Sequence, residues 1–139
     1  MRARILKPGD EALLVAAGAM IDEEMTPERA RTLLADPSFV ATVALEDGAP
    51  AGLIYGHVLP QLTRTALLLY SVDTAEAHRR KGAARAMIEA LRELSLGRGY
   101  YEMWVLTSAA NEPAMRLYAA CGGVRETFDD VMWVFPLEG

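Results

Sequence analysis

The sequence predicts one mixed α/β domain, built on a mostly antiparallel sheet of about seven strands with helices on both faces. Three observations lead to this prediction. The 139 residues are 52% hydrophobic, which suits a single compact core. Short apolar or alternating runs recur along the whole chain, as strands require. Segments with helical start and stop signals separate these runs: two follow the first run, and single ones lie between later runs.

The N-terminal part is expected to hold one strand and two helices. Arg2–Leu6 alternates and predicts a short strand. Asp10 follows a Pro-Gly pair and is expected to cap a helix over Glu11–Ile21. Thr26 and Pro27 give the start of a second, short helix, since proline suits the first helical position.

Three strands are expected next. Phe39–Leu45 and Ala51–Leu59 are apolar runs joined through Asp47-Gly48, a dipeptide typical of a two-residue hairpin turn. Thr65–Asp73 is apolar throughout its first half and predicts a long buried strand.

The C-terminal half is expected to alternate helices with strands. Glycines end the first of these helices, and Asn111 caps the second. The expected elements are a helix over Gly82–Leu96, a strand over Tyr101–Leu106, a helix over Glu112–Cys121, and a final hairpin of Val124–Phe128 and Val131–Phe135.

The overall composition excludes several functions. The net charge is −5, which disfavours a nucleic-acid surface because such domains carry a broad basic face. One cysteine, Cys121, and two histidines are too few for a disulfide framework or a metal site. The chain has no apolar run of membrane-spanning length, roughly 18 residues. We therefore expect a cytoplasmic protein with no metal, nucleic-acid or membrane partner.

A basic loop precedes the helix that begins near residue 82. Helix N-termini attract anions, and small residues let a phosphate approach the backbone. The segment is therefore a candidate phosphate site, although a solvated basic turn before an ordinary helix explains it too. Its residues are Arg79, Arg80, Lys81, Gly82, Ala83 and Ala84.

Two motifs in the expected order resemble one family. Arg79-x-x-Gly82-x-Ala84 resembles the R/Q-x-x-G-x-G/A signature of the GNAT superfamily of acyl-CoA-dependent N-acetyltransferases. The later segment "NEPAMRLYAACGGV" resembles that family's N-x-x-A-x-x-L-Y-x-x-x-G-[F/V] motif. From Phe39 to Phe135 the chain also looks similar to the aminoglycoside 3-N-acetyltransferase branch, with "VLP" and "HRRKG" the strongest parts.

The resemblance implies acetyl-CoA as co-substrate and gives several residues a role. The loop amides would hold the coenzyme A pyrophosphate, with Asn111 as a helix cap, a coenzyme contact or both. The backbone of Val72, Asp73 and Thr74 would hold the pantetheine arm where this strand separates from the next. The Tyr118 hydroxyl would serve as general acid, whereas a tyrosine with its ring packed in the core is the plainer alternative.

The general base is left open by the sequence. The aminoglycoside-acetylating branch places an aspartate where this chain has Ser71. Asp73 lies on the same strand face as Ser71 and is the first candidate base, although a turn-capping role or a bulge would remove it. Glu102, Glu46 and a water relay are the alternatives.

The acceptor is expected to be a small amine that acidic side chains attract. Tyr55 and His57 alternate on one strand and could line its cleft. A protein N-terminus, a lysine, a polyamine or a non-catalytic acyl-CoA-binding module are the other interpretations. The apolar end of the chain could pair across a homodimer. The candidate acidic residues, which are equally typical of ordinary surface turns, are Asp22, Glu23, Glu24, Asp129 and Asp130.

Overall fold

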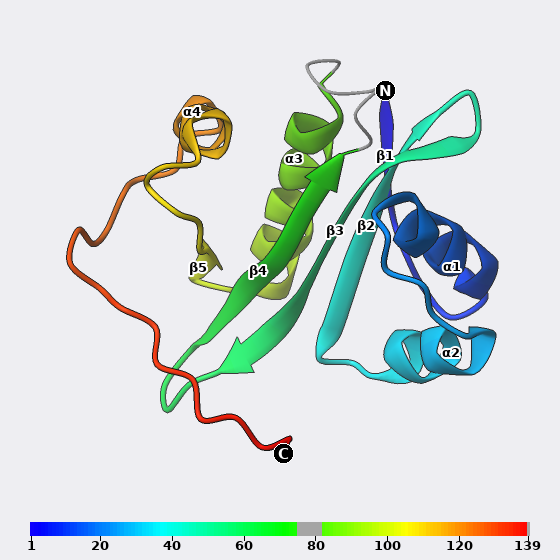
Figure 1. The fold of residues 1–139 in the computed structure, drawn as a ribbon, viewed down its shortest axis with the longest axis horizontal. Helices are drawn as coiled ribbons and strands as arrows, with labels where there is room; N and C mark the ends of the chain where they lie inside the picture. The colour runs from blue at the N-terminus through cyan, green and yellow to red at the C-terminus, as the bar shows by residue number, and fades with distance from the viewer. Residues whose placement is uncertain (75–81, 139) are drawn as a thin grey trace.

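The computed structural model describes residues 1–74 and 82–138. Within these residues the chain forms five strands and four helices (Figure 1). In chain order they are β1 (Arg2–Ile5), α1 (Glu11–Met20), α2 (Pro27–Ala35), β2 (Phe39–Glu46), β3 (Ala49–Pro60), β4 (Thr65–Thr74), α3 (Ala83–Arg98), β5 (Glu102–Val105) and α4 (Glu112–Ala120). None of the helices described is long and apolar enough to cross a membrane.

The described strands form one mixed sheet in the order β1-β2-β3-β4-β5. The first four strands pair antiparallel, and β5 pairs parallel with β4. A parallel pair needs a crossover connection, and the chain segment that contains α3 supplies it. The prediction of a mixed, mostly antiparallel sheet is therefore confirmed.

Helices cover the sheet on both faces, as expected (Figure 1). On one face α3 packs against the sheet through Met87, Ile88 and Leu91, which join a core cluster with Ile54 and Leu67. On the other face α1 and α2 cover a second cluster that includes Leu14, Leu34 and Leu53. The alternation of β3 explains this division, because Leu53 and Ile54 point to opposite faces.

Most of the predicted helix caps, helix ends and turns are present in the structure. Thr26 Oγ1 accepts a hydrogen bond from the Arg29 N–H at 3.1 Å and caps α2. Asp47 and Gly48 form the β2–β3 turn with φ values of 52° and 81°. Gly99 ends α3 with φ 76°, so the helix runs two residues past the expected Leu96.

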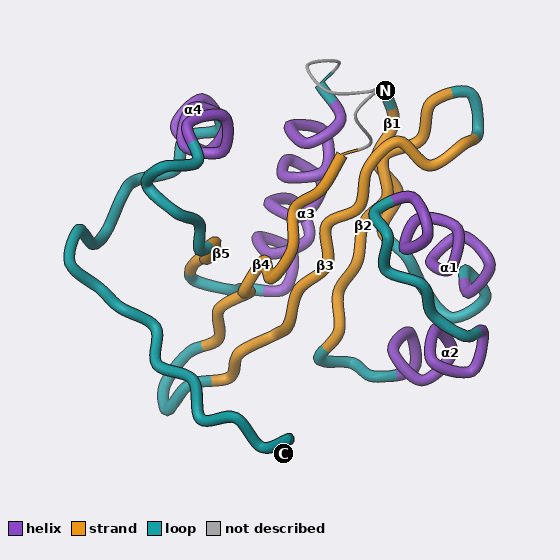
Figure 2. The backbone as a smooth tube through the Cα atoms, viewed as in Figure 1, coloured by secondary structure: helices purple, strands orange, loops and turns teal. Residues whose placement is uncertain are grey.

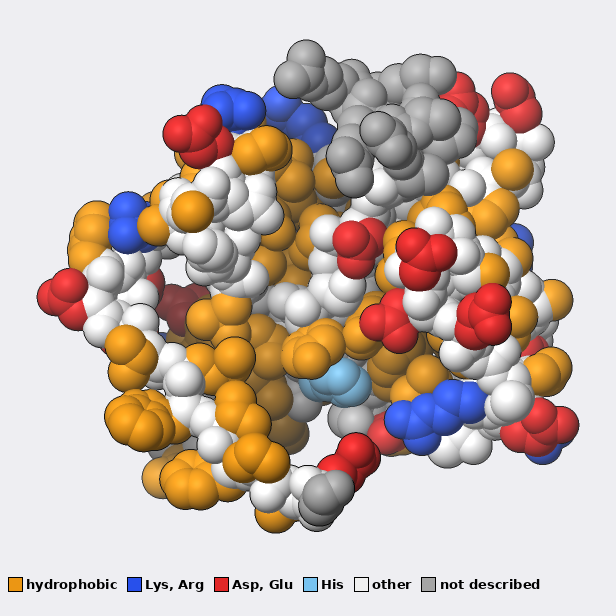
Figure 3. All heavy atoms as spheres, viewed as in Figure 1, with side chains coloured by type: hydrophobic (Ala, Val, Ile, Leu, Met, Phe, Trp, Pro, Cys, Tyr) orange, Lys and Arg blue, Asp and Glu red, His pale blue; other side chains and the backbone are white. Residues whose placement is uncertain are grey.

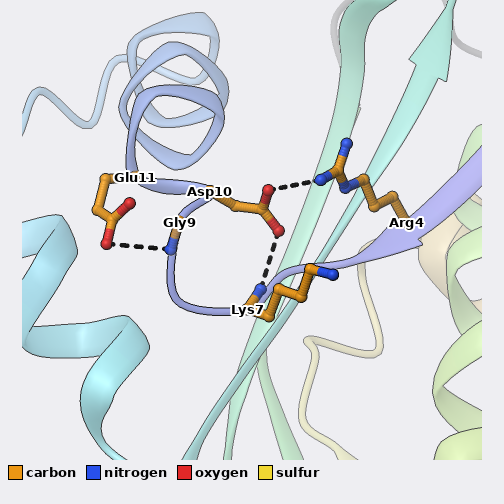
Figure 4. A network of polar contacts seen from close by, with 5 residues as sticks. All are labelled: Arg4, Lys7, Gly9, Asp10 and Glu11. Atoms are coloured by element: carbon orange, nitrogen blue, oxygen red, sulfur yellow. Dashed lines mark hydrogen bonds and ion pairs between the residues drawn. The ribbon is translucent and has the colours of Figure 1, made fainter.

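Asp10 stands at the start of α1 but its side chain does not cap that helix. Its carboxylate accepts a hydrogen bond from the Lys7 N–H at 3.0 Å and pairs with the Arg4 guanidinium at 2.6 Å (Figure 4). Asp10 is buried, so these two partners satisfy a charge that water reaches poorly. The pair fixes the β1–α1 turn to the edge strand.

The expected final hairpin does not form, so the prediction of seven strands was wrong by two within the described residues. Residues 124–138 run as an extended loop without strand pairing (Figure 2). Their side chains are exposed, including Val131, Trp133 and Phe135 at 75%, 81% and 85%. Alternation in sequence indicates which side chains share a face, but it does not supply a partner strand.

A β-bulge interrupts the pairing of β3 with β4. Tyr55 pairs with Ser71 and Gly56 pairs with Leu69, so Tyr70 is an extra residue without a partner on β3. Gly56 permits this close approach, because a Cβ there would lie 2.0 Å from the Leu68 carbonyl oxygen. Tyr70 and Ser71 are therefore both turned to the face that α1 and α2 cover, and Val72 packs against the α3 side.

Candidate active site

A cleft of about 710 Å³ opens between the C-terminal end of β4 and helix α4. It brings together residues from the end of one strand, the start of one helix and the face of another, which lie between Val72 and Tyr118 in the sequence. The residues that line it are Val72, Asp73, Thr74, Ala84, Asn111, Pro113, Ala114, Arg116, Leu117 and Tyr118. Six of these, Val72, Asp73, Thr74, Ala84, Asn111 and Tyr118, are residues that the sequence singled out for the coenzyme.

The separation of β4 from β5 creates the cleft. Ladder pairs between the two strands run from Ala66–Glu102 to Leu69–Val105. β5 ends there, and β4 continues to Thr74 with its β5-facing edge unpaired among the described residues. Backbone groups on that edge are available for a ligand, because an unpaired edge strand recruits further hydrogen-bonding partners.

Ser71 and Asp73 lie side by side on β4, and Asp73 lines the cleft. The Ser71 hydroxyl donates a hydrogen bond to Asp73 Oδ2 at 2.7 Å. The bulge falls before Ser71, so it does not separate the two side chains. Asp73 is exposed, so its carboxylate keeps open positions that a ligand can use.

Tyr118 projects from α4 into the same cleft. Burial raises the pKa of its hydroxyl above the ordinary value, and the nearby Asp73 carboxylate and Cys121 raise it further. The hydroxyl is therefore protonated throughout the neutral range. Leu117 and Tyr118 are half-buried against the α3-side core cluster, so the ring is packed while the residue still lines the cleft.

The start of α3 forms the adjoining wall. Gly82 is the N-cap with φ 84°, a left-handed conformation that favours glycine. Ala83 is buried against the core, and Ala84 lines the cleft. Arg79, Arg80 and Lys81 lie outside the described residues.

The start of α4 is the second helix terminus at the cleft. Asn111 Oδ1 accepts a hydrogen bond from the Ala114 N–H at 3.2 Å, so the expected cap is confirmed. Arg116 also lines the cleft and lies 3.9 Å from Glu112 on the same helix. The sequence analysis did not single out Arg116, although it stands inside the second motif as the only cation there.

Four rings form an aromatic cluster on the sheet face that α1 and α2 partly cover. Tyr55 and His57 belong to it, as the sequence suggested, and Phe39 and Tyr70 complete it. The ring centroids of Tyr55 and Tyr70 are 5.6 Å apart, and those of Phe39 and His57 are 6.0 Å apart. Burial raises the pKa of Tyr55, with smaller contributions from Glu23, Tyr70 and Asp73.

The acidic turn between α1 and α2 borders this cluster through one residue. Glu23 is close enough to Tyr55 to raise its pKa. The Glu23 N–H donates to the Gly18 carbonyl at 2.8 Å, which ties the turn to α1. Asp22 and Glu24 are exposed in the same turn. On the face drawn in Figure 3, acidic side chains gather beside a stretch of hydrophobic ones.

The remaining candidates lie elsewhere. Asp129 and Asp130 were expected in a hairpin turn, but they stand in the exposed C-terminal loop and do not line the cleft. Glu46 and Glu102 do not line it either. Glu102 accepts a hydrogen bond from the Trp104 indole N–H at 2.7 Å. Cys121 is buried, and burial raises the pKa of its thiol, so it is a poor nucleophile.

Comparison with solved structures finds the same fold in characterised enzymes. An aminoglycoside acetyltransferase from an uncultured soil metagenomic sample is 31% identical, with a TM-score of 0.82 and 98% of this chain and 97% of that chain covered. A second such enzyme from a soil sample, in complex with sisomicin, is 18% identical with a TM-score of 0.86 over 99% and 96% of the two chains. An aminoglycoside N-acetyltransferase in complex with coenzyme A is 16% identical, with a TM-score of 0.77 over 96% and 98%.

A family model for the acetyltransferase (GNAT) family matches residues 12–123. Comparison with curated protein sequences gives no significant match. The family match and the shared fold identify the protein as an N-acetyltransferase. The chain belongs to the GNAT family and resembles aminoglycoside acetyltransferases, which confirms what the two sequence motifs indicated.

Proposed function

We propose that this enzyme transfers the acetyl group of acetyl-CoA to a primary amine of a small cationic acceptor by direct attack in a ternary complex. One observation carries the proposal: the unpaired end of β4, the start of α3 and Tyr118 all border a single cleft. Its relative at 31% identity is described as an aminoglycoside acetyltransferase, which supports an aminoglycoside-like acceptor.

The coenzyme would lie along the cleft from α3 to α4. The first N–H groups of α3, after Gly82, have no partner within the helix and suit the pyrophosphate, because helix N-termini carry partial positive charge. The β5-facing edge of Val72 to Thr74, which is unpaired among the described residues, suits the amide groups of the pantetheine arm. Arg116 adds a guanidinium that can pair with a phosphate.

Tyr118 would assist departure of the sulfur. The amine nitrogen attacks the thioester carbon, the C–N bond forms, the C–S bond breaks, and the thiolate takes up a proton. A thiol has an ordinary pKa of about 8.5 and a tyrosine of about 10, so full transfer to a free thiolate is unfavourable. The Tyr118 hydroxyl therefore acts while the C–S bond is breaking, by donating its hydrogen bond to the sulfur.

Asp73 would receive the incoming amine. Its carboxylate is exposed at the cleft, is held by the Ser71 hydroxyl, and acts electrostatically on both Tyr118 and Tyr55. A carboxylate there attracts an ammonium ion and takes the proton that the nitrogen loses, directly or through water. Asp73 would thus supply the carboxylate that the aminoglycoside-acetylating branch places at the position of Ser71.

The test is a thiol-release assay with acetyl-CoA. Aminoglycosides, polyamines, amino acids and N-terminal peptides are offered in parallel, and mass spectrometry identifies the acetylated product. We expect turnover with small polycationic amines. Tight coenzyme binding without turnover of any amine would favour the acyl-CoA-binding module instead, and preferred turnover of peptides would favour a protein substrate.

A further inference from the structure

The aromatic cluster of Phe39, Tyr55, His57 and Tyr70 is only partly a core feature. Tyr55 and Phe39 pack against the cluster beneath α1 and α2. Tyr70 does not, because 66% of its surface remains exposed. A large ring that is held against other rings and still faces solvent presents a flat binding surface.

The β4 bulge holds Tyr70 in this position. Tyr70 has no partner on β3, and its ring lies 5.6 Å from that of Tyr55 and 6.3 Å from that of His57. Gly56 allows β4 to approach closely enough for the bulge to form. Two neighbouring rings, those of Tyr55 and His57, thus hold the exposed ring of Tyr70.

The cluster continues into the cleft through Asp73. Tyr55 pairs with Ser71 across β3 and β4, the Ser71 hydroxyl donates a hydrogen bond to Asp73 Oδ2 at 2.7 Å, and Asp73 lines the cleft together with Tyr118. The Asp73 carboxylate also contributes to the raised pKa of both Tyr55 and Tyr118. Glu23 adds a second carboxylate beside Tyr55. A bound amine can therefore place its nitrogen at Asp73 and its carbon skeleton against the rings.

We propose that the aromatic cluster is a binding subsite for the ring that carries the acetylated amine, and that Tyr70 is its specificity-determining residue. The inference rests on the proposed function. The shared chemistry of its ligands is a primary ammonium held on or close to a ring that can pack against aromatic faces, either the C–H face of an amino sugar or the flat ring of an arylalkylamine. Aromatic faces attract cations within about 6 Å and stack with flat partners.

A linear polyamine is expected to bind this aromatic cluster less well than a ring-borne amine. It offers the same charge to Asp73 and Glu23, but only a narrow methylene chain to the rings. Immobilising that chain also costs rotational freedom that a ring has already lost. The cluster therefore favours ring-borne amines over chains of equal charge.

The test compares two matched substrate pairs with acetyl-CoA. Neamine and spermine have equal numbers of amino groups, and 2-phenylethylamine and n-octylamine have equal numbers of carbons and one amine each. We expect kcat/KM to favour the ring in at least one pair by about tenfold. A preference in the first pair indicates an amino sugar as the ligand, and a preference in the second pair indicates an arylalkylamine.

Variants assign this preference to the exposed ring. Tyr70→Ala is expected to reduce the ring-to-chain ratio to within about twofold of unity, and Tyr70→Phe to keep it, because stacking needs the ring and not the hydroxyl. Leu96→Ala is the control, since this α3 side chain is also 72% exposed. A ratio that Tyr70→Ala leaves unchanged overturns the inference.

Equilibrium binding separates this inference from the proposed function. The same four amines are titrated into the protein saturated with coenzyme A, which needs no turnover. A ring preference that depends on Tyr70 without any acetyl transfer supports the subsite and contradicts the proposed function. Acetyl transfer without ring preference keeps the proposed function and overturns the subsite.

Discussion

At the scale of single residues, the environment of Tyr118 fits a hydrogen-bond donor better than an anion. Burial and the neighbouring Asp73 both favour the neutral phenol. Because the pKa of Tyr118 is raised, the proton stays on its oxygen over a wider range of pH. Ionisation of Tyr118 should not limit activity below the ordinary tyrosine value of about 10.

Tyr118→Phe removes the proposed hydrogen bond to sulfur and little else. We expect kcat to fall by about 100-fold, because general-acid assistance is lost, with the dissociation constant for coenzyme A within about twofold of wild type. Stopped assays for kcat and calorimetry for coenzyme affinity check this. Tyr101→Phe is the matched control, since Tyr101 hydrogen-bonds Gln61 at the opposite end of β4. Equal kcat in wild type and Tyr118→Phe would rule out the acid role.

At the scale of elements, the β3–β4 pair positions the site. The bulge leaves Val72 packed against the α3-side core cluster and places Ser71 and Asp73 on the opposite face of β4. Gly56 is the residue that this arrangement requires most, because a methyl group there would overlap the backbone of Leu68.

Gly56→Ala is expected to lower the free energy of unfolding by about 3 kcal/mol, since the two strands must separate to admit the methyl group. The melting temperature should fall by roughly 10 °C. Gly97→Ala is the control: its Cβ meets nothing within 4 Å in α3, so a gain of about 0.5 kcal/mol is expected. Thermal unfolding followed by circular dichroism measures both, and a Gly56→Ala melt like that of wild type would contradict the proposed role of the bulge.

The helix caps and the turn that were predicted correctly are features that residues close in the sequence determine. Caps at Thr26 and Asn111 and the turn at Asp47 depend on neighbours within four residues, and the structure has them. The cleft residues that the sequence singled out for the coenzyme converge because the end of β4, the start of α3 and helix α4 meet there. Tyr70 was missed because a bulge is defined by the partner strand, which alternation along one strand does not reveal.

At the scale of the whole molecule, the domain and its C-terminal segment differ sharply in packing. Two clusters fill the two sides of the sheet, and they contain no residue after Cys121 among those described. The family match also ends at residue 123. Segment 124–138 is exposed along its length, and many of its side chains are large and apolar.

A chain that ends after Gly123 is therefore expected to fold. Its melting temperature should lie within about 3 °C of the full chain, because the removed segment buries none of its described side chains. Calorimetric unfolding of the two proteins measures the difference. A fall of more than about 10 °C would show that the segment packs on the domain in solution.

The bulge at Tyr70 has a consequence for how this enzyme can change. Leu67 and Leu69 face the α3 side before it, and Val72 faces that side after it. Removing the single codon for Tyr70 would restore simple alternation and leave every other side chain of β4 on its present face. An exposed ring at the proposed acceptor subsite can thus be gained or lost in one genetic step while the core is kept. Deletion of Tyr70 is therefore a practical way to alter the proposed acceptor subsite without disturbing the rest of β4.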